Sequence, residues 1–254
     1  MIGIIRSDPW QELRRFTPAR IALGCSGSSL PTGELLRLGL AHALARDAVH
    51  LPLDVPALEK SLCAMPWPVL RVYSQAPDRA TYLLRPDLGR RLADPSTALL
   101  SGHASKGFDV LFIVADGLSS LAVQNHTIPL LQALRPMLPK IWSVGPVVIA
   151  EQGRVALGDE IGELLQVKIV VLIIGERPGL SSPDSLGVYL TFAPRIGRTD
   201  AERNCISNIR PEGLTYLVAA RKIAWLLKEA YRLKLSGVKL NRESMGSDSI
   251  DPGD

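Results

Sequence analysis

A run of mostly aliphatic residues beyond the middle of the chain most constrains how the chain can fold. Residues 167–174 read VKIVVLII, and only Lys168 interrupts the run. β-Branched residues dominate it, which favours a strand over a helix. Because polar residues do not alternate with the apolar ones, the run predicts a strand buried on both faces, as in a parallel sheet. The next five residues, 175–179, read GERPG and are typical of a tight loop.

The segments on both sides of this run alternate between strand and helix patterns. Further strands are predicted at about 69–74, 109–115, 144–150, 188–192 and 205–209. The last helix is predicted at about 214–234 with one apolar face. A helical stretch between the strands at 109–115 and 144–150 should break at Pro129. The alternation predicts a doubly wound, Rossmann-like α/β domain with a mostly parallel sheet over residues 66–240.

Three loops near predicted strand ends are the first candidates for a site. They cover residues 116–119, 175–187 and 198–210. Ligands of open α/β sheets bind at the carboxyl ends of the strands, and this rule draws attention to such loops. Taken alone, however, residues 175–179 are more simply interpreted as a strand-ending turn with a surface ion pair.

The two ends of the chain differ from this central part. Helices are predicted at about 7–23 and 32–48, and the proline-rich residues 50–68 are interpreted as a connection. Residues 1–65 are therefore interpreted as a small helical unit in front of the α/β domain. The polar tail, residues 241–254, is expected to be disordered.

Composition and cysteine usage argue against several classes of protein. The net charge of +4 is too small to indicate a nucleic-acid partner. The apolar runs are shorter than the ~20 residues of a membrane helix, and the N-terminus lacks the long apolar segment of a secretory signal. Cys25, Cys63 and Cys205 are odd in number and form no CxxC pair. This pattern predicts reduced thiols in a cytosolic protein, and neither a disulfide framework nor a structural zinc site.

The sequence contains none of the common short motifs for phosphate binding or nucleophilic catalysis. There is no GxGxxG and no GxxxxGK[ST], and Ser26 lies in GCSG instead of a GxSxG elbow. The histidines, which show no metal-ligand spacing and no DxHxxG motif, are His42, His50, His103 and His126. Each is interpreted as a surface residue or a satisfied core residue. The residues alone thus predict a fold and a set of loops, but no reaction.

Four longer segments nevertheless resemble one known family. They are RPDLGRRL (85–92), VADGLSSLAVQNH (114–126), GERPGLSSPDSLGVYLTFAPR (175–195) and RTDAERNCISNIRPEG (198–213). These strings are similar to the light chain of ethanolamine ammonia-lyase, and the similarity covers roughly residues 10–238. One departure is Cys25-Ser26, where the family pattern has Arg-Ala between the two glycines.

The resemblance implies an adenosylcobalamin-dependent lyase that converts ethanolamine into acetaldehyde and ammonia. In that family a large barrel-shaped subunit holds the substrate, and the light chain helps to enclose the cobalamin between the subunits. The cofactor keeps its own benzimidazole as the lower ligand, which agrees with the missing DxHxxG motif. The chain is thus expected to need the large subunit, to be inactive alone and to carry no catalytic residue. Many relatives have an N-terminal extension linked to packaging in a bacterial microcompartment; the short N-terminus here leaves a free or a packaged cytoplasmic location open.

The resemblance also carries three cobalamin contacts to this chain by position. They are Val155 in EQGRV, Glu176 in GERPG and Cys205 in CISN. Glu176 can accept a hydrogen bond from a corrin amide, Val155 offers an apolar or backbone contact, and Cys205 is small and polarisable rather than a nucleophile. The alternative for Glu176 is an ion pair with Arg177 or another arginine. The alternative for the whole chain is a stand-alone α/β module that binds a nucleotide-like ligand.

Overall fold

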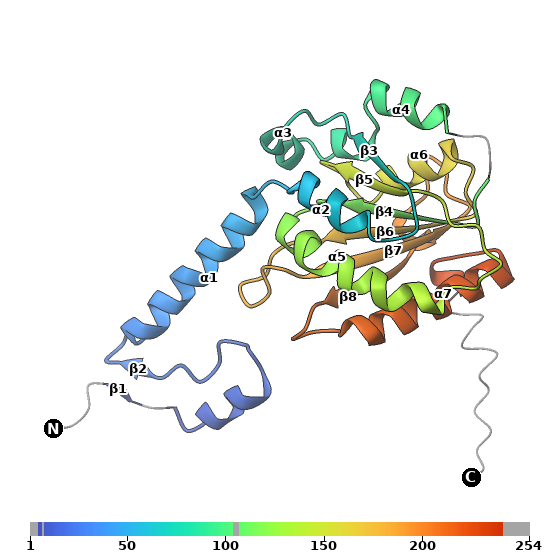
Figure 1. Ribbon diagram of the computed structural model, residues 1–254. Helices are drawn as coiled ribbons and strands as arrows, with labels where there is room; N and C mark the ends of the chain where they lie inside the picture. Colours follow the sequence, from blue (N-terminus) through green and yellow to red (C-terminus); the bar gives the residue numbers. More distant parts are fainter. Residues whose placement is uncertain (1–4, 7, 104–106, 241–254) are drawn as a thin grey trace, which may run out of the picture.

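The computed structural model describes residues 5, 6, 8–103 and 107–240, and a six-stranded mixed sheet lies at its centre (Figure 1). The strands, in sheet order, are β3 (Val69–Tyr73), β5 (Val147–Glu151), β4 (Val110–Ala115), β6 (Ile169–Gly175), β7 (Leu186–Phe192) and β8 (Asn204–Ile209). The first four run parallel, β7 is antiparallel to β6, and β8 is antiparallel to β7. The predicted α/β class and the mostly parallel sheet are therefore confirmed.

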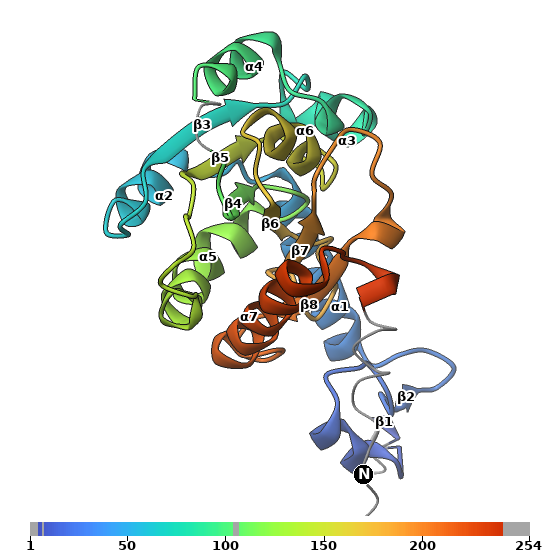
Figure 2. The same cartoon turned by 90° about the vertical axis from the view of Figure 1, so that its right-hand side faces the viewer.

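Helices cover both faces of this sheet, as Figure 2 shows when the strands are viewed from another side. One face packs against α2 (Val55–Leu62), α5 (Ser120–Leu134) and α7 (Tyr216–Leu233). The other face packs against α4 (Asp94–Ser101) and α6 (Leu157–Leu164). Every residue of β4 and β6 is buried, which explains why both strands are unbroken apolar runs in the sequence. The shorter elements of this part are α3 (Arg79–Leu84), η2 (Leu88–Arg90), η3 (Arg135–Met137) and η4 (Asp200–Glu202).

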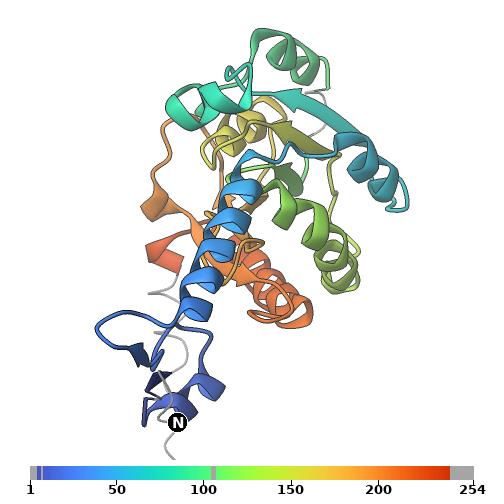
Figure 3. The same cartoon turned by 90° about the vertical axis from the view of Figure 1, so that its left-hand side faces the viewer.

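The N-terminal segment projects from the body along one long helix (Figures 1 and 3). Its elements are β1 (Ile5–Arg6), η1 (Gln11–Phe16), β2 (Cys25–Ser26) and α1 (Thr32–His50). The helix predicted at 32–48 is confirmed, but the one predicted at 7–23 is wrong, because among its described residues only η1 is helical. Pro18 explains the early end of η1, since a proline disfavours helical backbone at the preceding residue. Accordingly, Thr17 is extended, with a φ of −152°.

Two proline-based predictions were also wrong. Residues 50–68 are more than a connection: Asp54 caps α2 by accepting a 3.0 Å hydrogen bond from Ala57, and Pro56 lies in the first turn, where it is tolerated. Likewise, α5 continues through Pro129. The proline removes one backbone hydrogen bond, but the buried Leu130 and Leu131 that follow it hold α5 on the core. Burial against the sheet thus outweighs the local preference of proline.

Two further expectations concern the ends of the chain and membranes. The tail at 241–254 lies outside the described residues. Within the described ranges, no helix is long and apolar enough to span a membrane.

Candidate functional site

The buried carboxylate of Asp116 fixes two of the turns that follow the strands. Asp116 comes directly after β4, and its Oδ1 accepts hydrogen bonds from the backbone N–H groups of Gly117 (2.9 Å) and Gly153 (3.1 Å). Its Oδ2 accepts one from Gln152 (3.0 Å), while Arg79 Nη1 lies 3.5 Å away. Burial raises the pKa of Asp116 to about 6. One side chain thus ties the end of β4 to the turn after β5.

The turn after β4 and the end of β6 touch through their backbones. The N–H of Leu118 donates a 2.9 Å hydrogen bond to the carbonyl of Gly175. A Cβ on Gly175 would overlap the carbonyl oxygen of Ser119, and one on Gly117 would overlap that of Gly175. Gly117 also has a positive φ of 57°, which favours glycine. Glycine is therefore required at both positions for the two turns to meet.

Glu176 follows β6 and points its carboxylate back across β7. Its Oε2 accepts hydrogen bonds from the hydroxyl of Ser185 and from the N–H of Asn208, the latter at 3.2 Å. Gly187 leaves room for this carboxylate, since a Cβ there would lie 2.8 Å from Oε1. Among the described residues, Glu176 forms no ion pair with Arg177 or any other arginine. The carboxylate is thus fixed by neutral donors, and the alternative interpretation as half of an ion pair is wrong.

Val155 and Glu176 line the same cavity. It has a volume of about 340 Å³, and its other walls include Tyr82, Leu118 and Tyr189. Cys205 lies on β8 directly opposite Tyr189 of β7. Partial burial raises the pKa of the Cys205 thiol, while the nearby Tyr189 hydroxyl lowers it. The structure therefore brings Val155 and Glu176, two of the three expected contacts, into one cavity. The third, Cys205, lies on the next strand beside Tyr189, which lines that cavity.

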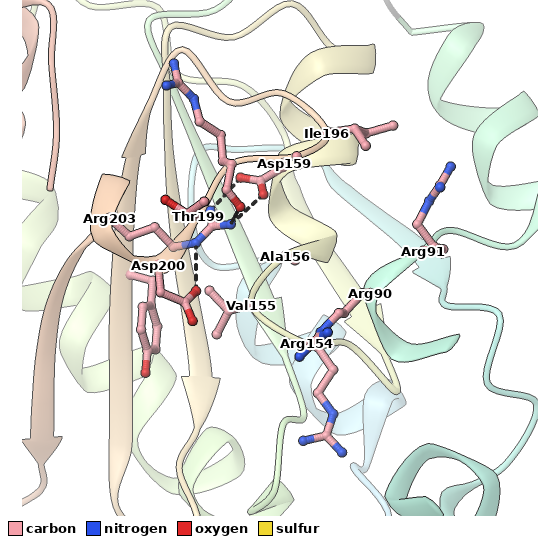
Figure 4. Close-up of a pocket in the computed structure, with 13 residues that line it drawn as sticks. Arg90, Arg91, Arg154, Val155, Ala156, Asp159, Ile196, Thr199, Asp200 and Arg203 are labelled. Atoms are coloured by element: carbon pink, nitrogen blue, oxygen red, sulfur yellow. Dashed lines mark hydrogen bonds and ion pairs between the residues drawn. The ribbon is translucent and has the colours of Figure 1, made fainter. Parts of the chain in front are cut away.

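A second cavity adjoins this one through three shared residues, Arg154, Val155 and Tyr189. It has a volume of about 590 Å³ and is shown in Figure 4. Five arginines line it: Arg90, Arg91, Arg154, Arg198 and Arg203. We call it the arginine cavity. Its size is within the range of ordinary small-molecule sites, roughly 300–1,000 Å³.

Sequence reasoning passed over several residues of this region. Asp116, Tyr82 and Tyr189 had no role, although Asp116 follows a predicted strand directly. Arg154 stands next to Val155 in EQGRV, and Arg90 lies in RPDLGRRL, so both lay inside quoted strings. That these distant segments meet at one edge of the sheet can be seen only in the folded structure.

His126 illustrates a correct interpretation from the sequence. It is buried, with its Nδ1 2.8 Å from the hydroxyl of Tyr216 and its Nε2 3.1 Å from Asp184. It is thus a satisfied core histidine. Over the described residues, no group of three or more His, Cys, Asp or Glu side chains is placed to hold a metal ion.

Comparison with known proteins gives a consistent result. The family model described as "Ethanolamine ammonia-lyase light chain (EutC)" matches residues 7–241. The chain is 58% identical over 241 residues to the ethanolamine ammonia-lyase small subunit of Azotobacter vinelandii, covering 93% of this chain and 89% of that protein. It is 55% identical to the small subunit of Ralstonia nicotianae (93% and 89% covered) and 56% identical to that of Pseudomonas aeruginosa (93% and 88%). The chain therefore belongs to the ethanolamine ammonia-lyase light chain family.

Proposed function

We propose that this chain, together with a large subunit, encloses adenosylcobalamin in an enzyme that deaminates ethanolamine to acetaldehyde and ammonia. The observation that carries the proposal is the shared cavity of Val155 and Glu176 at the carboxyl edge of the sheet. In open α/β sheets this edge is where ligands bind. Family membership supports the reaction, and the position of the cavity supports its assignment to the cofactor. We assign the cofactor contacts to Val155, Glu176 and Cys205.

The residues around the cavity fit a corrin. A corrin is broad, flat and fringed with amides, so its partner surface needs flat walls and both donors and acceptors of hydrogen bonds. Gly117 and Gly175 provide a wall of backbone without side chains. Glu176 Oε1 accepts no hydrogen bond from any described residue, so it is able to accept one from a corrin amide. The bound cofactor supplies radical chemistry through its cobalt–carbon bond, while these residues bind and orient it.

We propose that the large subunit completes the enclosure of the cofactor. Apolar side chains exposed on the N-terminal segment support a protein partner: Trp10 is 67% exposed, Phe16 73% and Leu36 68%. We propose residues 1–65 as a unit that contributes to this interface, and residues 66–240 as a Rossmann-like cobalamin-binding domain. A stable complex should bury more than ~1,200 Å². A cytoplasmic location, free or inside a microcompartment, stays a prediction.

The first test uses the chain co-purified with its large subunit. We expect acetaldehyde from ethanolamine and adenosylcobalamin only when both subunits are present. Acetaldehyde from the purified light chain alone would contradict the proposal. Two separate species on size-exclusion chromatography, combined with binding of a nucleotide-like ligand by this chain alone, would favour the stand-alone module.

The second test concerns Glu176. Glu176→Ala removes a charged acceptor, which typically costs roughly 1.5–3 kcal/mol, so cobalamin should bind about ten- to a hundred-fold more weakly to the complex. Glu176→Gln keeps an acceptor oxygen and should lose less. Glu229→Ala on α7, where Glu229 pairs with Arg232, is the matched control and should leave affinity unchanged. With the complex intact and far-UV circular dichroism unchanged, an unaltered affinity of the alanine variant would remove Glu176 from the site.

A further inference from the structure

The arginine cavity contains more cationic groups than its carboxylates neutralise. Arg203 forms a buried two-point pair with Asp159, with both N–O distances at 2.6 Å. Arg91 pairs with Glu160 (3.1 Å), and Arg198 pairs with Glu202. The carboxylates that belong to this part of the molecule are thus already matched. Asp200 also lines the cavity, but its side chain is 94% exposed and lies 3.4 Å from Arg203.

Two arginines of the cavity have no carboxylate partner among the described residues. Arg154 Nη2 donates to the carbonyl of Tyr82 (3.0 Å), and its guanidinium lies 4.2 Å from the centre of the Tyr82 ring. Its Nε is buried and has no hydrogen-bond partner among the described residues. The side chain of Arg90 forms no hydrogen bond or ion pair with any described residue. In the view of Figure 4, both lie across Val155 and Ala156 from the Arg203–Asp159 pair.

The backbone holds these two arginines next to each other. The N–H of Arg154 donates a 2.8 Å hydrogen bond to the carbonyl of Gly89, the residue before Arg90. A Cβ on Gly89 would lie only 2.8 Å from Arg154 Cγ, so glycine is needed for this close approach. The backbone segments that carry the two arginines are therefore held side by side by the fold.

Backbone donors add to the positive character of the same wall. Val155 and Ala156 lead into the eight-residue helix α6. Among the described residues, their N–H groups find no acceptor. The N-terminus of a helix carries a partial positive charge, and free N–H groups there bind anions. Asp159 in the first turn of α6 does not cancel this, because Arg203 holds both its oxygens.

We propose that Arg90, Arg154 and the N–H groups of Val155 and Ala156 bind phosphate, namely the phosphodiester in the nucleotide tail of cobalamin. This inference rests on the proposed function. The arginine cavity shares Arg154, Val155 and Tyr189 with the cavity that Val155 and Glu176 line, so one molecule can occupy both. Cobalamin combines an amide-fringed corrin ring with a single anionic group, the phosphodiester, on its tail. Guanidinium groups and free backbone N–H groups are the donors that suit a phosphate.

The experiment compares two ligands that differ in the tail. The complex with the large subunit is titrated with cyanocobalamin and with dicyanocobinamide, which lacks the nucleotide and its phosphate, and binding is followed by absorbance. Each of Arg90→Gln and Arg154→Gln should weaken cyanocobalamin roughly tenfold, and both together more. Dicyanocobinamide should bind all variants equally. Arg85→Gln is the matched control, because Arg85 lies in the same segment but pairs with exposed Asp87. Size-exclusion chromatography and circular dichroism check the assembly.

Competition by inorganic phosphate separates the tail from free phosphate as the source. Phosphate should compete with cyanocobalamin, should not compete with dicyanocobinamide, and should lose its effect in the double variant. Equal weakening of both corrinoids, or unchanged cyanocobalamin affinity in the double variant, would overturn the proposal. If phosphate binding were lost while cyanocobalamin affinity stayed the same, the cavity would bind free phosphate and the tail assignment would be wrong. If neither corrinoid bound the wild-type complex, the proposed function itself would fail.

Discussion

The turn at residues 152–156 and the loop at residues 176–185 both lie at the carboxyl edge of the sheet, but they are held in different ways. The short turn is fixed from inside by Asp116, a buried carboxylate that also holds the end of β4. In the described part of the chain, no single buried carboxylate anchors the long loop. Separate side chains hold it, including the Ser119 hydroxyl, which donates to the carbonyl of Pro183 (2.8 Å), and His126, which contacts Asp184.

Two further contacts of the long loop are longer and come from segments distant in the sequence. Arg20 of the N-terminal segment donates to the carbonyl of Leu180 (3.3 Å), and Arg210 donates to that of Ser181 (3.4 Å). A single buried anchor should fail together with the core, whereas a set of separate contacts should be lost one at a time. The difference suggests that the wall at Val155 is fixed, and that the loop behind Glu176 is adjustable. The following predictions test this contrast, beginning with the largest expected effect.

Removing the Asp116 carboxylate should lower the stability of the whole α/β domain. Asp116→Ala leaves three backbone N–H groups and the guanidinium of Arg79 without their carboxylate. We expect the free energy of unfolding to fall by about 3–5 kcal/mol, measured by urea denaturation. Asp87→Ala, at an exposed carboxylate paired with Arg85, should leave it almost unchanged, because solvent screens an exposed ion pair. An Asp116→Ala loss as small as that of Asp87→Ala would mean that the anchor is not what fixes the short turn.

Asp116 should also make the free energy of unfolding depend on pH. The pKa of Asp116 is about 6 in the folded chain and 3.8 ordinarily, because burial disfavours the charged form. Between these values the folded protein holds a proton that the unfolded chain has lost. The part of the stability that depends on this proton is therefore full below pH 4 and is lost as the pH rises through 6. The shift corresponds to about 3 kcal/mol. Unfolding free energies at several pH values should show this slope in the wild type relative to Asp116→Asn; parallel curves would contradict it.

Weakening one contact of the long loop should have a smaller and more local effect. His126→Phe keeps the ring but loses its contacts with Tyr216 and Asp184. We expect a loss of about 1–2 kcal/mol. Hydrogen exchange should become faster in residues 176–185 and stay unchanged in β5 and the turn after it. Faster exchange in both regions would show that the short turn and the long loop are coupled, and would contradict the claim that they are held in different ways.

The sequence predicted the parts of this molecule that depend on burial along one segment. β4 and β6 are buried on both faces, so their positions are visible as unbroken aliphatic runs. Pro56 and Pro129 misled the prediction because a local backbone preference was outweighed by packing on the sheet. Tertiary burial of this kind leaves little trace in a short stretch of sequence.

The residues of the candidate site likewise fall into those that the sequence indicated and those that only the fold reveals. Glu176 could be singled out because it follows a predicted strand after one glycine, and the resemblance added Val155 and Cys205. The pairing of Arg90 with Arg154 could not be predicted, because it depends on a backbone hydrogen bond between segments more than sixty residues apart. That Asp159 is neutralised by Arg203 is likewise visible only in the fold.

The contact between Gly117 and Gly175 has a consequence for selectivity. A cavity wall made of side chains can adapt to a new ligand, because rotamers interconvert quickly and at little cost. This wall is backbone. Gly117 lies in the turn after the buried strand β4, and Gly175 is the last residue of the buried strand β6. To widen it, the sheet itself would have to shift. Ligands that differ in outline on this side should therefore be rejected rather than accommodated, and variants that broaden the ligand range should arise elsewhere along the edge.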